Sequence, residues 1–149
     1  MINNQENQYF VAELETGYVV IGDHQYFRGY TLFLCKEHIT ELHYLNEDYK
    51  AKYLIEMSWV AEAVHKAFKA DKMNYELLGN GDAHMHWHLF PRRLNEKNPA
   101  YPVWSVDSKI MYSEKVKPSI EELNELKKML FFELEKTAQK ILKVGDFLE

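Results

Sequence analysis

Three histidines alternate with apolar residues near the middle of the chain, in the segment HMHWHL at 84–89. Successive side chains of a β-strand point to opposite faces of its sheet, so a strand here places the imidazoles on one face and the apolar side chains on the other. Neighbouring imidazoles would be rooted ~6.6 Å apart, from two residues at about 3.3 Å each, and could surround one phosphate or one metal ion. The segment therefore predicts a sheet with one core face and one polar face.

A solvated strand face is the simplest interpretation of a single histidine on a strand. Three histidines in strict alternation favour a functional site instead. Clustered imidazoles repel one another when protonated, and the reference pKa of histidine is about 6.5, so at least one ring should be neutral near pH 7. A neutral imidazole is a nucleophile.

Length and composition exclude several classes of protein. The 149 residues match one domain, residues 1–149, and the 46% of hydrophobic residues favours a folded core. A net charge of -5 argues against nucleic-acid binding. We find no signal-peptide pattern and no apolar run of about 18 residues, so we expect a cytoplasmic protein that does not enter a membrane. Cys35 is the only cysteine, which excludes an internal disulfide.

The strand predictions rest on runs of β-branched and aromatic residues. GYVVIG and GYTLFLCK, between residues 17 and 36, predict two strands with a short connection. Two further strands are predicted on either side of Asn80-Gly81, a dipeptide that tolerates the positive φ angles of a tight turn. Short hairpin connections favour antiparallel pairing.

Two long helices are predicted from residues at three- and four-residue spacing. The first covers about 46–70, with Asn46 as its cap. The second follows Ser119, which forms a capping-box pattern with Glu122, and its spacing continues to Ile141. The proline-containing segment between 95 and 118 should be an irregular arm on the surface. The predicted fold class is α+β, an antiparallel sheet covered by two long helices.

The segment HMHWHLFPRR resembles the histidine triad motif of the HIT nucleotide hydrolases and transferases, His-x-His-x-His followed by two apolar residues. GYVVIGDHQYFRGYTLFLCKEH is similar to the family's strand, connection and strand ending in Lys-x-His. The resemblance covers a core motif region at about 17–93 and points to diadenosine polyphosphate hydrolase-like members. It implies a HIT-like fold, with the C-terminal arm and helix at about 95–143. It also implies a homodimer, which an exposed sheet edge independently favours.

In that family the middle histidine attacks the α-phosphorus of a nucleotide, and water then hydrolyses the nucleotidyl-histidine. The resemblance implies this catalytic role for His86, with His84 and His88 in the flanking positions. A backbone carbonyl commonly orients such a nucleophile, but the sequence does not identify it.

Three residues are candidates for substrate binding. Asp23 matches the residue with which the family holds the ribose hydroxyls, and a turn aspartate explains it equally well. Asn80 and Gly81 lie near the family's phosphate-binding Gln or Ser, which is missing here, and a structural Asn-Gly turn is the alternative. Arg92 and Arg93 are interpreted as a solvated strand end rather than a phosphate site.

The resemblance also bears on metals. His38 matches the Lys-x-His pattern, and in some members this histidine, the first triad histidine and an N-terminal CxxC hold a structural zinc. With Cys35 alone that site cannot form, so we expect no protein-bound metal and no other cofactor. Magnesium could still act through the polyphosphate of a substrate.

The leading hypothesis is a hydrolase that cleaves at the α-phosphate of a nucleoside polyphosphate, a dinucleoside polyphosphate or a nucleoside phosphoramidate. One alternative is a non-catalytic zinc- or nucleotide-binding module, since three histidines can ligate zinc and a triad can lose activity while keeping its pocket. A second alternative is a nucleotidyltransferase. Transferase relatives mostly carry glutamine in place of the third histidine, so His88 favours hydrolysis.

Overall fold

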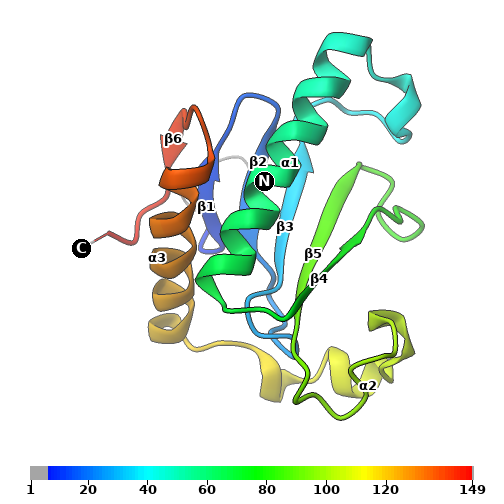
Figure 1. Ribbon diagram of the computed structural model, residues 1–149, viewed down its shortest axis with the longest axis vertical. Helices are drawn as coiled ribbons and strands as arrows, with labels where there is room; N and C mark the ends of the chain where they lie inside the picture. Colours follow the sequence, from blue (N-terminus) through cyan, green and yellow to red (C-terminus); the bar gives the residue numbers. More distant parts are fainter. Residues whose placement is uncertain (1–6, 149) are drawn as a thin grey trace.

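The computed structural model describes residues 7–148, and its centre is a six-stranded sheet in the order β4-β5-β3-β2-β1-β6 (Figure 1). Every neighbouring pair of strands is antiparallel. The strands are β1 (Phe10–Glu13), β2 (Gly17–Ile21), β3 (Thr31–Cys35), β4 (Lys72–Glu76), β5 (His86–Arg92) and β6 (Lys143–Val144). The predicted α+β class with an antiparallel sheet is confirmed.

Two long helices, α1 (Glu47–Ala67) and α3 (Ile120–Thr137), pack against each other and against the same face of the sheet (Figure 1). Their apolar sides and that sheet face form the main core. The segment after β5 contains short helical turns at Val103–Ser105, α2 (Ser108–Met111) and Glu114–Val116, with a further turn at Leu42–Tyr44 before α1. The other face of the sheet is therefore left for a site.

The predicted helix starts are confirmed by their caps. The Asn46 side chain accepts a hydrogen bond from the backbone N–H of Tyr49 at 2.9 Å. Ser119 Oγ accepts from the backbone N–H of Glu122 at 3.1 Å, and the Glu122 carboxylate accepts from the Ser119 N–H at 2.9 Å. Each side chain satisfies an N–H group that has no partner within the helix.

The predicted end of the second helix is wrong. The helix stops at Thr137, and Ala138 is extended. Ile141 still packs against the main core, but from an irregular segment that leads into β6. Apolar spacing therefore continued beyond the helix because the following segment buries its side chains in the same core. The sequence also gave no signal for β1 or for the two-residue β6 that pairs with it.

The predicted hairpin exists, but not with a tight Asn-Gly turn. β4 and β5 pair directly, while a loop from Leu77 to Met85 connects them. The positive φ angle in this loop, 74°, belongs to Gly79. Asn80 and Gly81 therefore lie within a longer loop, and they line the same cavity as His86 and His88 of β5.

A buried carboxylate joins α1 to the turn between β1 and β2. Glu56 is fully buried, and its carboxylate accepts hydrogen bonds from the backbone N–H groups of Glu15 and Thr16 and from the Thr16 hydroxyl. These bonds fix the helix relative to the strands that carry the core.

We expect Glu56→Ala to lower the free energy of unfolding by about 3 kcal/mol or more, because each buried donor left without a partner costs about 1–3 kcal/mol. Chemical denaturation measures this change. The matched control is Glu62→Ala, which removes an exposed ion pair with Lys66 on the same helix and should have little effect. Equal, small changes in both variants would contradict the anchoring role of Glu56.

Candidate active site

The register of β5 separates its two sets of side chains as predicted. His86 lies opposite Leu34 and His88 opposite Leu32, on the face away from the long helices. Met85, Trp87 and Leu89 pack in or against the main core. Trp87 is only partly buried, and its indole N–H has no hydrogen-bond partner among the described residues.

His84 is placed differently from the other two histidines. The regular strand begins at His86, so His84 precedes it. Its Nε2 donates to the backbone carbonyl of Cys35 at 2.6 Å, and its ring lies 4.9 Å from the ring of His38. His84 therefore supports the strand end through β3 and does not line the cavity described below.

The orientation of His86 is set by a backbone group. Its Nδ1 lies 2.6 Å from the carbonyl oxygen of His84. A carbonyl only accepts hydrogen bonds, so Nδ1 carries a proton, and in the neutral ring Nε2 keeps its lone pair. The structure thus identifies the carbonyl that the sequence left unassigned.

His88 is held by a tyrosine that sequence reasoning missed. The Tyr30 hydroxyl lies 2.6 Å from Nδ1 of His88, and the Tyr30 ring stacks on Phe90 with centroids 4.2 Å apart. Burial raises the pKa of Tyr30, so its hydroxyl stays neutral and can donate to Nδ1, leaving the proton of a neutral His88 on Nε2. A Cβ on Gly22 would come within 2.2 Å of the Tyr30 ring, so the ring needs a glycine beneath it.

The electrostatics of the site favour neutral imidazole. Burial, and secondarily the neighbouring His86, lowers the pKa of His88 from 6.5 to about 4. The two rings meet edge to face with centroids 4.6 Å apart. His88 is therefore an uncharged hydrogen-bond donor near pH 7, next to a ring whose free nitrogen can act as a nucleophile.

A cavity of about 440 Å³ opens in front of these two imidazoles. Its size is typical of a small-molecule site. Asn80 and Gly81 form part of its wall, and their contact with a substrate stays a prediction. The arm forms the opposite wall with Val103, Trp104, Val106, Ser108, Met111 and Tyr112.

The arm reaches the site because its base is anchored. Val103 and Met111 are buried in a small apolar cluster with Phe27 and Phe90, whereas Trp104 is 74% exposed at the cavity wall. The sequence predicted an arm on the surface but gave no reason to place it beside the histidines.

Asp23 does not line this cavity. Its side chain is 57% exposed, and its carboxylate pairs with Nδ1 of His24 at 2.8 Å. The structure therefore gives Asp23 a local partner, and its contact with a ribose stays a prediction.

Within residues 7–148, no three His, Cys, Asp or Glu side chains are grouped as ligands for a metal ion. Burial raises the pKa of the Cys35 thiol, which disfavours the thiolate that metals bind. In the same part of the chain, no helix has the length and apolar character needed to cross a membrane.

A profile of the HIT domain matches residues 3–95, the region that contains β1 to β5, α1 and all three histidines of the triad. The chain belongs to the HIT family. None of the curated proteins searched matches it.

Solved structures of histidine triad proteins share the fold of this HIT protein. A histidine triad protein from Bradyrhizobium japonicum has 20% sequence identity and a TM-score of 0.73, with 90% of this chain and 97% of that chain covered. One from Marinobacter aquaeolei has 22% identity and a TM-score of 0.72, with 87% and 92% covered. Diadenosine triphosphate hydrolase from Plasmodium falciparum has 14% identity and a TM-score of 0.59, with 89% and 80% covered.

The lowered pKa of His88 predicts how stability depends on pH. Below about pH 6.5 the unfolded chain takes up a proton that the folded protein binds only near pH 4, so stability is lost as the pH falls through this window. We expect the free energy of unfolding to decrease less over this window in His88→Asn than in the native protein. Urea denaturation across the pH range measures it, with the exposed His43→Asn as control. A His88→Asn profile parallel to that of the native protein would refute this assignment.

Proposed function

We propose that this HIT protein is a nucleotide hydrolase that cleaves at the α-phosphate of a nucleoside polyphosphate, a dinucleoside polyphosphate or a nucleoside phosphoramidate. The observation that carries the proposal is the bond from His86 Nδ1 to the His84 carbonyl, 2.6 Å long, which in the neutral ring leaves the lone pair on Nε2 of His86 beside the cavity. Nucleophilic attack through Nε2 requires this tautomer.

The reaction proceeds in two displacements. In the first, the lone pair of His86 Nε2 forms a bond to the α-phosphorus, and the bond from phosphorus to the leaving group breaks with its electron pair. The leaving group takes up a proton. The ring then carries a positive charge, which the hydrogen bond to the His84 carbonyl stabilises.

In the second displacement a water molecule attacks the same phosphorus and gives up a proton. The N–P bond breaks, and its electron pair returns to His86 as the nucleoside monophosphate leaves. In both steps the Nε2–H of His88, fixed by the Tyr30 hydroxyl, donates to a phosphate oxygen as negative charge develops there.

The geometry also bears on the alternative of a zinc-binding module. A zinc ion on the triad would need all three imidazoles to face one point, but the Nε2 of His84 is directed at the Cys35 carbonyl. This orientation favours nucleotide chemistry over a zinc module. The similar Plasmodium falciparum protein is a diadenosine triphosphate hydrolase, which supports a dinucleoside polyphosphate as one of the substrates to test.

We expect His86→Ala to keep the fold and to lower turnover at least about a thousandfold, because it removes the nucleophile of both displacements. Phosphorus NMR on a panel of nucleotide conjugates measures turnover, and circular dichroism checks the fold. Rapid quenching followed by mass spectrometry should find a nucleotidyl group on His86 of the native protein. His43→Ala removes an exposed histidine outside the site and serves as the control. An adduct on another residue, or residual activity near the native level, would exclude the mechanism.

The same assay separates the hydrolase from the zinc module. We propose that the protein needs no bound metal or other cofactor, so chelator-treated protein should still hydrolyse a phosphoramidate that has no polyphosphate chain. Magnesium should help only with polyphosphate substrates, where it neutralises charge and improves the leaving group. Activity that is lost with zinc and restored only by zinc would support the alternative.

We also propose a homodimer that forms along β4. This strand lies at the edge of the sheet and exposes Tyr75, an arrangement that pairing with a second copy would cover. Light scattering at micromolar concentration should show a dimer, and Tyr75→Lys should shift it toward monomer. A native protein that is monomeric at this concentration would disprove the proposal.

A further inference from the structure

A second cavity, of about 650 Å³, lies on the other side of the arm. None of the triad histidines lines it, and Val106 of the arm contributes to the walls of both cavities. Its polar lining is unusually basic. All three arginines of the chain line this cavity together with two lysines, namely Arg28, Arg92, Arg93, Lys69 and Lys97.

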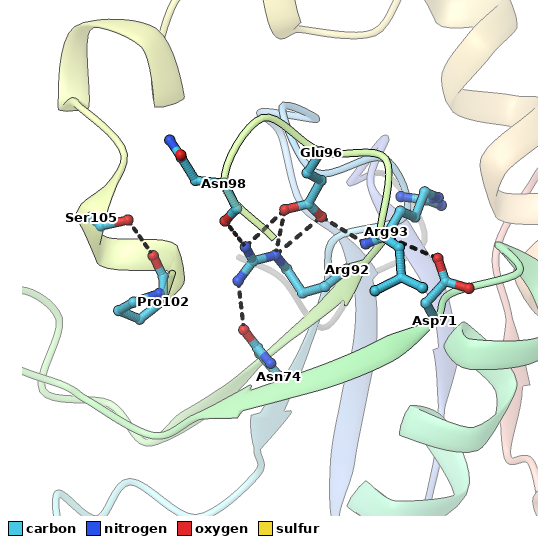
Figure 2. A network of polar contacts seen from close by, with 9 residues as sticks. Asp71, Asn74, Arg92, Arg93, Glu96, Asn98, Pro102 and Ser105 are labelled. Atoms are coloured by element: carbon cyan, nitrogen blue, oxygen red, sulfur yellow. Dashed lines mark hydrogen bonds and ion pairs between the residues drawn. The ribbon is translucent and has the colours of Figure 1, made fainter. Parts of the chain in front are cut away.

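Arg92 forms the fixed frame of this cavity. Arg92 is 5% exposed, and its guanidinium donates to Oε1 of Glu96 at 2.8 and 2.9 Å, to Oε2 of Glu96 at 3.1 Å and to the side-chain oxygen of Asn74 at 2.8 Å (Figure 2). It also lies 4.8 Å from the centre of the Phe27 ring. Arg92 is thus neutralised and immobilised, and the expectation of a solvated strand end is wrong for this residue because Glu96 folds back over it.

Arg93 is oriented by the same network, but within the described residues its guanidinium forms no ion pair of its own. Glu96 accepts a hydrogen bond from the backbone N–H of Arg93 at 2.8 Å (Figure 2). The Arg93 guanidinium donates to the backbone carbonyls of Arg28 and Phe68, at 3.0 and 2.7 Å, and these acceptors carry no net charge. Burial, and then the positive charge of Arg28, lowers the pKa of Arg93.

The other basic side chains of the wall also lack carboxylate partners. Within residues 7–148, four basic side chains of the wall form no ion pair with a carboxylate, namely Arg28, Lys69, Arg93 and Lys97. Besides Glu96, the acidic residue in the wall is Asp107, whose carboxylate accepts from the backbone N–H of Lys109 at the start of α2. Four positive charges therefore surround one cavity in a chain whose net charge is -5.

The backbone at Lys69 provides an independent observation. Lys69 follows the end of α1 with a φ of 51°. Among the non-glycine residues at 7–148, a positive φ occurs only at Lys69. Glycine is the usual residue at this position after a helix, because a side chain there is strained. The chain instead places an ammonium group in the cavity wall.

We propose that this cavity binds a small molecule with a diphosphate or triphosphate group, at a site separate from the triad. The planar guanidinium groups of Arg28 and Arg93 match phosphate oxygens, and the two lysines add charge. Glu96 is paired with Arg92, so Asp107 remains against four cations that form no ion pair, and this balance of charge suits a ligand with several negative charges. The concave wall and its volume fit a small molecule, and the negative net charge of the chain disfavours an extended nucleic acid.

Arginine side-chain NMR tests this site directly, because the chain has three arginines and all three line the cavity. The probe is inorganic pyrophosphate, added to protein that carries His86→Ala so that the triad reaction cannot interfere. We expect the Nε–H signals of Arg28 and Arg93 to shift and saturate together, with a smaller shift for Arg92. Sodium chloride at equal ionic strength is the control for screening.

A variant pair then assigns the charges. Arg28→Gln combined with Lys69→Gly removes two cations and places glycine where φ is positive, so the protein should fold normally and bind pyrophosphate at least tenfold more weakly. Lys109→Gln removes one positive charge just outside the cavity and should bind as the parent does. Shifts no larger than those caused by sodium chloride, or equal affinity in all three proteins, would overturn the proposal. Because binding is read without turnover, failure of the hydrolase proposal would leave this result unaffected.

Discussion

The pairing of β5 with β3 decides what each face of the sheet does. Trp87 lies opposite the fully buried Phe33, while His86 lies opposite Leu34 on the other face. A slip of one residue would exchange these faces and bury two imidazoles beneath α1. The apolar residues between the histidines therefore do as much for the site as the histidines, because they hold the register in which the imidazoles reach a cavity.

Most of the fold could be predicted from the sequence, because alternation and helix capping are visible in it. The period of two in 84–89, the Asn46 cap and the capping box at Ser119 are local patterns, and the structure realises each of them. The end of α3, the loop around Asn80 and the pairing of β1 with β6 depend on contacts between segments that are far apart in the sequence. No window of neighbouring residues carries that information.

For the site, too, local features could be predicted from the sequence and contacts between distant residues could not. The sequence placed His86 and His88 on one face because their spacing is local. It did not identify the Tyr30 hydroxyl that holds His88, which is separated from it by 58 positions, or the arm that forms the opposite wall. The net charge of -5 likewise gave no indication of a basic cavity, because a sum over the chain says nothing of where its three arginines gather.

The group that orients His86 belongs to the main chain. The acceptor is the carbonyl oxygen of His84, so any amino acid at that position supplies the same atom. A substitution at position 84 removes the hydrogen bond to the Cys35 carbonyl and the ring contact with His38, but it leaves the acceptor of His86 in place. Point mutations at position 84 would consequently not reveal what this hydrogen bond contributes. The tautomer of His86 is preserved when the side chain at position 84 changes, as long as the backbone keeps its path.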